Sequence, residues 1–179
     1  MGILRETLTT DRLTLRRPNL GDAPAIFERY AQDPWVTRYV LWEPHQSVAD
    51  TEEFLQACDD AWDLGIGHRP WAIERANDPR LIGMIGVTLQ ARRAEVGYVL
   101  ARDVWGHGYM TEALRAVIAH CLDTDAIDRV WAVADVDNPA SCRVMERAGM
   151  QHEGILRGWA RHPALPGARD CHCYALVSE

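Results

Sequence analysis

The sequence predicts an α/β fold with about seven strands and four helices, and two stretches of the chain carry this expectation. In the middle, three apolar segments separated by short turns predict an antiparallel meander, over residues 70–74, 81–88 and 94–100. After the meander, a helical period in residues 110–121 is followed by an apolar run in residues 130–134. We therefore expect amphipathic helices packed on a sheet.

The start of the chain predicts one strand and one helix. Residues 12–17 alternate, with Leu13 and Leu15 on one face, as in a half-buried strand. Asp22 is expected to cap the helix and Pro24 to lie in its first turn, since both residue types are favoured there. This helix should end near residue 33.

A second helix is predicted by Ser47 and Asp50, whose spacing resembles a capping box with Asp in place of Glu. The apolar residues that follow at helical spacing are Phe54, Leu55, Cys58 and Trp62. A loop rich in large rings, residues 35–45, connects the two helices.

The best-defined helix covers residues 110–121, where apolar residues recur with the amphipathic period. They are Met110, Ala113, Leu114, Val117, Ile118 and Cys121. Further on, Asn138 and Pro139 predict the cap and first turn of a short helix that stops at Gly149. The last two strands are expected near residues 153–159 and 171–177.

Composition predicts a single domain over residues 1–179 and disfavours two classes of partner. The chain is 47% hydrophobic, enough for a substantial core at this length. A net charge of −7 repels a phosphate backbone and an anionic lipid surface, so neither nucleic acid nor a membrane is expected as partner. The lack of a signal-like N-terminus and the irregular spacing of five cysteines predict a cytoplasmic protein with reduced thiols.

The turn before the best-defined helix, Trp105 to Tyr109, predicts an anion-binding site. Gly106 and Gly108 have no side chain to hold a ligand away. The backbone N–H groups and the dipole at a helix N-terminus attract phosphate whatever the net charge of the protein. The alternative is a simple strand-to-helix turn that needs glycine only for its backbone angles.

Two other phosphate-binding motifs fit this turn poorly. A dinucleotide-binding fingerprint requires a third glycine where this chain has Thr111. A nucleoside-triphosphate loop requires Gly-Lys followed by Ser or Thr, and the sequence contains no such tripeptide.

The segments around this turn resemble the cofactor motifs of the GNAT acyltransferase superfamily. Residues 95–100, followed by 105–113, look like its acetyl-CoA motif, and residues 138–141 with 146–150 resemble its next cofactor motif. The likeness extends from Thr10 through Tyr174 and is strongest to the ribosomal-protein N-acetyltransferase (RimJ/RimL) branch. Each motif is moderately specific, and their order and spacing make the match strong.

The resemblance implies a mixed, mostly antiparallel sheet that splays open between its fourth and fifth strands, residues 94–100 and 130–134. The pantetheine arm of acetyl-CoA would lie in that split, with Asn138 on one side, although the Asn138 side chain is also suited to capping its own helix. The backbone groups expected to bond the pantetheine amides are those of Tyr98, Val99 and Leu100. The residues expected to enclose the pyrophosphate are Trp105, Gly106, His107, Gly108, Tyr109, Met110 and Thr111.

One position departs from the family pattern. The family often has Gln or Arg at the start of its phosphate motif, where this chain has Asp103 beside Arg102. A side-chain cation on the phosphates is therefore left open, whereas the backbone cradle does not depend on one.

Acetyl transfer to an amine needs a group that takes a proton from the amine and one that protonates the departing thiolate. The resemblance places a carboxylate base at Glu95, with ordered water, Glu43 or a purely structural ion pair to Arg92 or Arg93 as alternatives. Many relatives protonate the thiolate with a Tyr where this chain has Met145, which cannot donate a proton.

The ribosomal-protein branch instead has a Ser at the position of Ser141, so Ser141 is the candidate acid. A hydrogen bond from Ser141 to its own helix backbone is the alternative.

Trp42 and Glu43 lie in the loop that lines the acceptor site of relatives, and they are the candidates for selecting the amine. Cys171-His172-Cys173 offers two thiolates on one face, but a structural zinc needs four ligands and only His162 lies near in sequence. We therefore expect acetyl-CoA as cosubstrate and no metal.

The expected activity is N-acetylation of a primary amine by direct attack on acetyl-CoA, with a protein or peptide N-terminus favoured as acceptor. A small amine, such as an antibiotic or a polyamine, is the alternative within the same class. A non-catalytic acyl-CoA-binding sensor is the alternative from another class, because Met145 removes one familiar proton donor. The expected state is a monomer or a homodimer.

Overall fold

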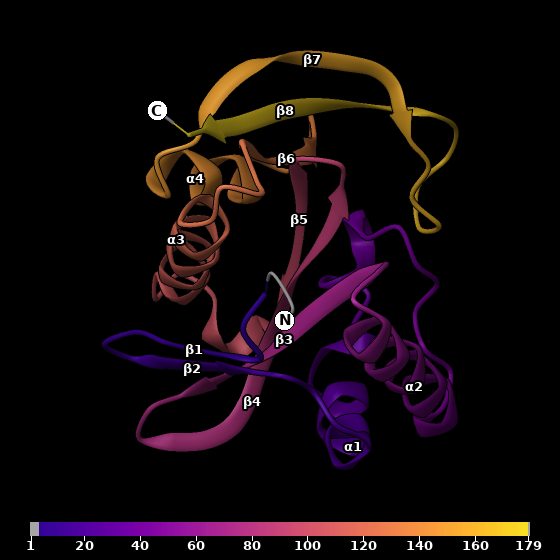
Figure 1. Ribbon diagram of the computed structural model, residues 1–179. Helices are drawn as coiled ribbons and strands as arrows, with labels where there is room; N and C mark the ends of the chain where they lie inside the picture. Colours follow the sequence, from indigo (N-terminus) through magenta and orange to yellow (C-terminus); the bar gives the residue numbers. More distant parts are fainter. Residues whose placement is uncertain (1–3, 179) are drawn as a thin grey trace.

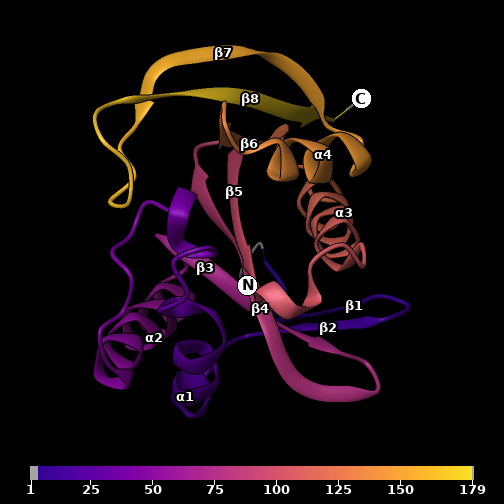
Figure 2. The same cartoon turned by 180° about the vertical axis from the view of Figure 1, so that it is seen from behind.

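The computed structural model describes residues 4–178, which form one mixed sheet of eight strands between two pairs of helices (Figures 1 and 2). In their order across the sheet, the strands are β1 (Thr7–Thr9), β2 (Leu13–Arg16), β3 (His68–Arg75), β4 (Asp78–Gln90), β5 (Arg93–Leu100), β6 (Arg129–Asp135), β8 (Arg169–Val177) and β7 (Gln151–Ala160). The helices are α1 (Ala23–Ile26), α2 (Val48–Leu64), α3 (Tyr109–Leu122) and α4 (Pro139–Arg147). In Figure 1, α3 and α4 lie on one side of β5, and α1 and α2 lie on the other.

The split predicted in the sheet is confirmed. β5 and β6 are parallel and pair only from Arg93 with Arg129 to Glu95 with Trp131, whereas the other neighbouring strands are antiparallel. Beyond Glu95 the two strands separate. The split lies between the fifth and sixth strands because β1 adds one strand that was not predicted, and three residues are too few to show an alternating pattern.

The start of the first predicted helix is confirmed in position, since Asp22 is the N-cap residue of α1 and Pro24 lies in its first turn, but the Asp22 side chain makes no capping hydrogen bond there. A 3₁₀ turn precedes α1 and is capped by Asn19, whose side chain accepts a hydrogen bond from the N–H of Gly21 at 2.9 Å, while the Asp22 carboxylate accepts from the N–H of Asn19 at 2.9 Å. The segment is also irregular, with a 3₁₀ turn before α1 and a π-helical turn, Phe27–Ala31, after it.

Asp22 instead forms an ion pair that ties this segment to the sheet. Its side chain is 10% exposed and accepts hydrogen bonds from Nη1 and Nη2 of Arg16 at 2.8 and 2.7 Å. Arg16 also donates to Glu74 on β3, so the arginine on β2 joins two strands and the α1 segment. These bonds raise the pKa of Arg16 further above its ordinary value.

The remaining helix predictions are confirmed. Ser47 and Asp50 form the capping box of α2, and the Asn138 side chain accepts from the N–H of Ser141 at the start of α4. The buried residues of α3 include all six that were predicted to face the core: Met110, Ala113, Leu114, Val117, Ile118 and Cys121. Within residues 4–178, no helix is both long and apolar enough to cross a membrane.

We predict that Asp22→Asn lowers the free energy of unfolding by about 1.5–3 kcal/mol, the usual contribution of hydrogen bonds to a charged group. Urea denaturation at pH 7 measures the change. Asp60→Asn is the matched control, because Asp60 is exposed on α2 and accepts a single bond from Gln56. Equal losses for the two variants would show that the Arg16–Asp22 pair does not stabilise the fold.

Candidate active site

The turn between β5 and α3 leaves the N-terminus of α3 open to a ligand. Gly106 and Gly108 have φ angles of 80° and 78°, in the left-handed region that favours glycine. Gly108 is the N-cap residue of α3, and no side chain caps the helix. A Cβ on Gly106 would meet no atom within 4 Å, and one on Gly108 would meet only an Arg12 guanidinium nitrogen at 3.6 Å. The first N–H groups of α3 therefore have no capping side chain, and no side chain on either glycine would hold a ligand away, which suits an anion.

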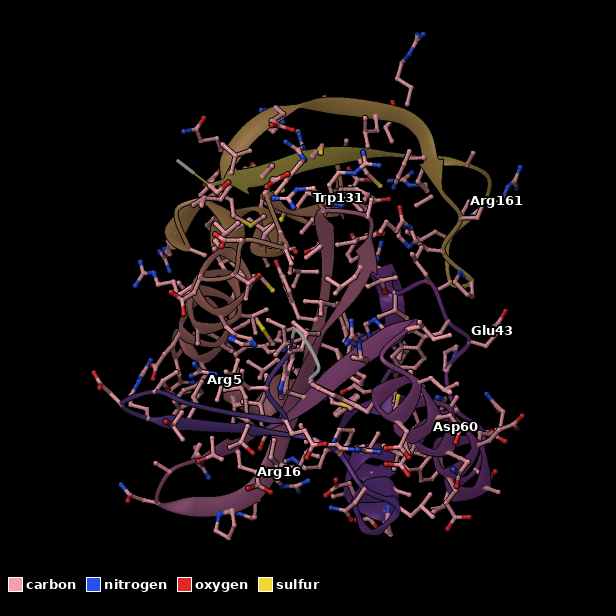
Figure 3. All side chains as sticks on the ribbon, viewed as in Figure 1. Arg5, Arg16, Glu43, Asp60, Trp131 and Arg161 are labelled. Carbon is pink, nitrogen blue, oxygen red and sulfur yellow. The ribbon has the colours of Figure 1, made fainter. Side chains whose placement is uncertain are left out.

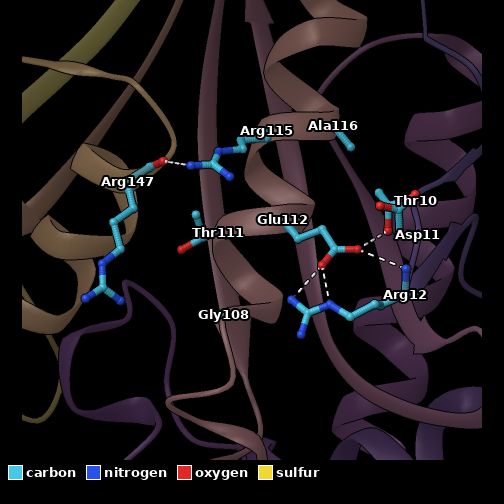
Figure 4. A pocket seen from close by; sticks show the side chains of 9 residues that line it. All are labelled: Thr10, Asp11, Arg12, Gly108, Thr111, Glu112, Arg115, Ala116 and Arg147. Atoms are coloured by element: carbon cyan, nitrogen blue, oxygen red, sulfur yellow. Dashed lines mark hydrogen bonds and ion pairs between the residues drawn. The ribbon is translucent and has the colours of Figure 1, made fainter.

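A cavity of about 680 Å³ lies beside this turn (Figure 4). Its lining residues come from the β1–β2 turn, α3 and α4, and they are Thr10, Asp11, Arg12, Gly108, Thr111, Glu112, Arg115, Ala116 and Arg147. Arg12 pairs with Glu112 at 2.6 Å and donates to the carbonyl of His107 at 3.1 Å. This arginine therefore fixes the first turn of α3 against the β1–β2 turn.

Two further arginines reach the cavity from neighbouring helices. Arg115 on α3 donates to the backbone carbonyl of Arg147 on α4 (Figure 4). Asp103, the residue that departs from the family pattern, points elsewhere and pairs with Arg29. The sequence analysis did not find Arg115 and Arg147 as phosphate candidates, because only the packing of α3 against α4 brings them to the turn.

The expected pantetheine strand lies at the edge of the split. Tyr98 and Val99 are half-buried, Leu100 is buried, and all three lie beyond the last residue of β5 that pairs with β6. The carbonyl of Leu100 already accepts a hydrogen bond from Trp105 Nε1 at 2.7 Å. Trp105 thereby fixes the start of the anion-binding turn to the end of β5.

Across the split, the hydroxyl groups of Tyr98 and Ser141 lie 2.7 Å apart. The Tyr98 hydroxyl is also 3.2 Å from the Ser141 carbonyl, so the tyrosine can donate to that carbonyl while the serine donates to the tyrosine. Burial raises the pKa of Tyr98, which keeps its proton in place at neutral pH. The sequence analysis considered only the backbone of Tyr98, and the structure adds its side chain.

On the α4 side of the split, the packing shows the contacts of three further residues that the sequence analysis discussed. Asn138 uses its side chain to cap α4, with its Oδ1 3.2 Å from the N–H of Ser141. The partner of the Ser141 hydroxyl is Tyr98, not a carbonyl of its own helix. Met145, at the position of the family tyrosine, has no exposed surface and belongs to the core.

Glu95 lies half-buried at the point where β5 and β6 begin to separate. Within residues 4–178 it makes no ion pair: Arg92 pairs with Asp128, and Arg93 makes none with Glu95. The alternative of a structural Glu95–arginine pair is therefore wrong. Burial raises the pKa of Glu95, as expected for a carboxylate without a compensating cation.

The loop between α1 and α2, which was expected to line the acceptor site, places Trp42 and Glu43 differently. Trp42 is half-buried and packs on His45, with ring centroids 5.2 Å apart, and His45 in turn packs on Phe54 of α2. Glu43 is exposed, and its side chain projects outward from the molecule in Figure 3. The structure thus gives Trp42 a packing contact and leaves Glu43 in solvent.

A buried histidine fastens this loop to the other half of the sheet. His162, in the loop after β7, is 5% exposed, and its Nδ1 lies 3.2 Å from the carbonyl of Val40. Its Nε2 lies 3.3 Å from the Asp135 carboxylate at the end of β6. Both loops approach one another on the right of Figure 1. The sequence analysis considered His162 only as a neighbour of the cysteines.

We refer to the contacts among His162, Asp135 and Arg169 as the clasp, and Asp135 lies at its centre. Its side chain has no exposed surface, accepts two hydrogen bonds from Arg169 at 2.9 Å each, and accepts the N–H of Asp137 at 2.9 Å. The hydrogen bonds from Arg169 are the main cause that lowers the pKa of Asp135. Because the carbonyl of Asp135 also accepts the N–H of Asn138, the clasp fixes the start of α4.

The zinc alternative at Cys171-His172-Cys173 gains no grouped set of ligands among the described residues. Cys171 and Cys173 are buried free thiols, and His162 is engaged with Val40 and Asp135. In the described part of the chain, no three His, Cys, Asp or Glu side chains are grouped to hold a metal ion.

Comparison with known proteins matches residues 12–151 to the acetyltransferase (GNAT) domain family. YoaA of Bacillus subtilis (strain 168), described as an uncharacterized N-acetyltransferase, is 35% identical over 95% of this chain and 96% of its own. The ribosomal-protein-serine acetyltransferase of Escherichia coli (strain K12) is 29% identical over 69% of each chain. A ribosomal L7/L12 α-N-protein acetyltransferase solved with coenzyme A shares the fold, with a TM-score of 0.86 and 22% identity over 97% of this chain and 98% of its own.

We predict that Asp135→Asn lowers the free energy of unfolding by about 1.5–3 kcal/mol at pH 7, because Arg169 loses the buried one of its two charged partners. The folded-state pKa of Asp135 is lowered, so its stabilising effect is complete above the unfolded value of about 3.9 and is lost as the pH falls through the folded value. The difference between wild type and variant should therefore shrink below about pH 4.

Urea denaturation at several pH values measures this difference. Asp137→Asn is the control, since Asp137 also pairs with Arg169 but its side chain is 67% exposed. We expect it to lose less than about 1 kcal/mol. A difference for Asp135→Asn that stays constant from neutral to acid pH would contradict the role given to its charge.

Proposed function

The chain belongs to the acetyltransferase (GNAT) family and is an N-acetyltransferase, and from that premise we propose that it transfers the acetyl group of acetyl-CoA to a primary amine. The favoured acceptor is the N-terminus of a protein or peptide. One observation carries the proposal: Glu95 is a half-buried carboxylate with no ion-pair partner in the described residues, placed where the sheet opens.

Acetyl-CoA fits the residues around the split. The pyrophosphate would lie on the N–H groups at the start of α3, in the turn from Trp105 to Thr111, with Arg115 and Arg147 close by as cations. The pantetheine arm would follow the residues of β5 that have no partner on β6, Tyr98 to Leu100. Relatives solved with coenzyme A or acetyl-CoA support this assignment.

The transfer itself needs proton acceptors and a proton donor. Glu95 removes a proton from the alkylammonium, and the neutral nitrogen then attacks the thioester carbonyl carbon. The thiolate is expelled, and a second proton leaves the nitrogen as the amide forms. The thiolate takes its proton from the hydroxyl pair of Tyr98 and Ser141. Met145 cannot donate a proton to the thiolate, but the hydroxyls of Tyr98 and Ser141, which lie across the split from one another, can do so.

The acceptor is inferred from relatives and from the open side of the split. Relatives named for ribosomal-protein acetylation favour a protein N-terminus. A small amine is the second candidate, supported by a structural neighbour described as a Microcin C7 self immunity acetyltransferase in complex with acetyl-CoA and AMP.

The experiment that tests the function supplies acetyl-CoA with matched peptides that have either a free or a blocked N-terminus, and in parallel with polyamines and aminoglycosides. Release of the CoA thiol and the mass of each acceptor are measured. We expect a gain of one acetyl group on the free peptide and none on the blocked peptide. Turnover of small amines alone would transfer the proposal to the second candidate, and binding of acetyl-CoA without any turnover would favour a sensor.

We predict that Glu95→Gln lowers kcat/KM by 10²- to 10⁴-fold, the usual contribution of a general base, and leaves the affinity for acetyl-CoA nearly unchanged. The raised pKa of Glu95 means that wild-type activity falls as the pH drops through a value above the ordinary carboxylate range, since the base is then protonated. The variant should lack the contribution of Glu95 to this limb of the pH profile.

The control for Glu95 is Glu52→Gln, an exposed position on α2. Full activity of Glu95→Gln from acid to neutral pH would assign the base to ordered water or to another residue.

We predict that Ser141→Ala and Tyr98→Phe each lower kcat by about tenfold or more, equivalent to the loss of about 1.4 kcal/mol of transition-state stabilisation, with little change in KM for acetyl-CoA. Because the two hydroxyls act as one pair, the double variant should lose less than the product of the single losses. Multiplicative losses would show that the two residues act independently, and an unchanged kcat would assign Ser141 to helix structure.

A further inference from the structure

A row of four residues crosses the face of the sheet that carries Glu95. His68 on β3 pairs directly with Thr88 on β4, and Thr88 pairs directly with Glu95. Glu95 in turn pairs with Trp131 on β6. Side chains of directly paired residues point to the same face of a sheet, so these four side chains share one face.

Two glycines, Gly86 on β4 and Gly97 on β5, lie beside this row and also pair with one another. Each is two residues along its strand from Thr88 or Glu95, so both lie on the same face. A Cβ on Gly86 would be 2.7 Å from Cε1 and Nε2 of His68, which places the imidazole ring over Gly86. A Cβ on Gly97 would meet no atom within 4 Å.

Neither glycine has a positive φ, so the backbone does not demand glycine at these positions. Glycine within a strand weakens it and often marks a close approach of another group. At Gly86 that group is the His68 ring. Over Gly97 the space is open, with Glu95 on the same strand at one side and the His68 ring toward β4 at another.

The His68 ring is suited to accept a proton over this open space. Its Nδ1 lies 3.3 Å from Thr88 Oγ1, and donation from Nδ1 to that oxygen leaves the lone pair of Nε2 on the side of Gly86. The residue remains accessible to solvent, yet the surrounding protein displaces enough water to lower the pKa of His68. No charged neighbour contributes to that lowering, so His68 is neutral near pH 7.

The reaction requires two protons to leave the acceptor nitrogen. An alkylammonium has three protons on nitrogen and the amide product keeps one. The first must leave before the lone pair can attack, and the second leaves once the C–N bond has formed. One proton is gained by the thiolate, so one proton is released to solvent for each acetyl group transferred.

We propose that the open space over Gly97 seats the acceptor amine and that His68 accepts one of its two departing protons while Glu95 accepts the other. This inference rests on the proposed function and extends it to a second base. Within the row itself, the ionisable groups are His68 from β3 and Glu95 from β5, whereas β4 contributes Thr88 and β6 contributes Trp131. The same face also carries Arg93 and Arg129, each two residues along its strand from the row, and Asp135, which is bound to Arg169 at the end of β6. Both bases then lose their protons to water, and the Tyr98–Ser141 pair regains from water the proton that it gave to the thiolate. The net release is therefore one proton per acetyl group.

The test compares His68→Gln and His68→Ala with wild type over a range of pH. We expect kcat to fall by on the order of 10²-fold and KM for acetyl-CoA to remain unchanged. If both His68 and Glu95 must be deprotonated for activity, the slope of log kcat against pH on the acid side should be lower by about one in either His68→Gln or Glu95→Gln. In the double variant the slope should be lower by about two. Added imidazole should restore part of the activity of His68→Ala.

His120→Gln is the matched control, because His120 lies on α3, bonds the N–H of Arg5 and is not part of this face. A folded His68→Gln with the wild-type kcat and acid slope would overturn the role of His68. A wild-type protein that acetylates no amine would overturn the proposed function instead, and the role of His68 with it.

Gly97→Ala tests the seat of the amine separately from the proton transfer. Its φ suits alanine and its Cβ would meet no protein atom, so the variant should fold with at least wild-type stability. We expect KM for the amine to rise about tenfold or more, which corresponds to about 1.4 kcal/mol of lost binding, with an unchanged KM for acetyl-CoA. An unchanged KM for the amine would place the acceptor elsewhere.

Discussion

The interruption of pairing between β5 and β6 is the constraint on which the rest of the structure depends. Parallel pairing stops after Glu95 and Trp131, so the remaining backbone groups of β5 on that side have no strand to bond. Unpaired buried backbone groups are costly, and a ligand with amide groups is a natural partner for them. The same separation leaves room for the Tyr98 side chain to reach Ser141 on α4, which spans the split with a hydroxyl contact instead of a ladder bond.

Successive side chains along β5 alternate between the two faces of the sheet, so the proposed proton donor and the proposed proton acceptors lie on opposite faces. Tyr98 points toward α4, whereas Glu95 and Gly97 point to the opposite face. A thioester held from the side of α3 would therefore meet a proton donor on one face and proton acceptors on the other. The clasp of Asp135 and His162 is anchored to the end of β6 and holds the Val40 loop, so that loop is positioned by the strand that forms the other edge of the split.

A structural feature can be predicted from the sequence when the residues that determine it lie close together along the chain. α3, the Ser47 capping box and the Asn138 cap follow from residues within one or two turns of each other, and the cofactor motifs resemble a family closely enough to imply the split. The Asp22 side chain does not cap α1, because its carboxylate is bound by Arg16, on a different element, and by the N–H of Asn19. The Tyr98–Ser141 contact and the His162–Val40 contact join residues 43 and 122 positions apart, and only the assembled sheet brings them together.

The separation of charges in the site gives a physical reason for an amine acceptor. Three arginines lie around the turn at α3, while the face of Glu95 offers a carboxylate without an ion-pair partner among the described residues. An ammonium group is drawn to that carboxylate, but a poorly solvated ion pair is expensive to maintain. Transfer of the proton from nitrogen to carboxylate removes both charges at once, so the burial that raises the pKa of Glu95 also favours the neutral amine that attack on a thioester requires.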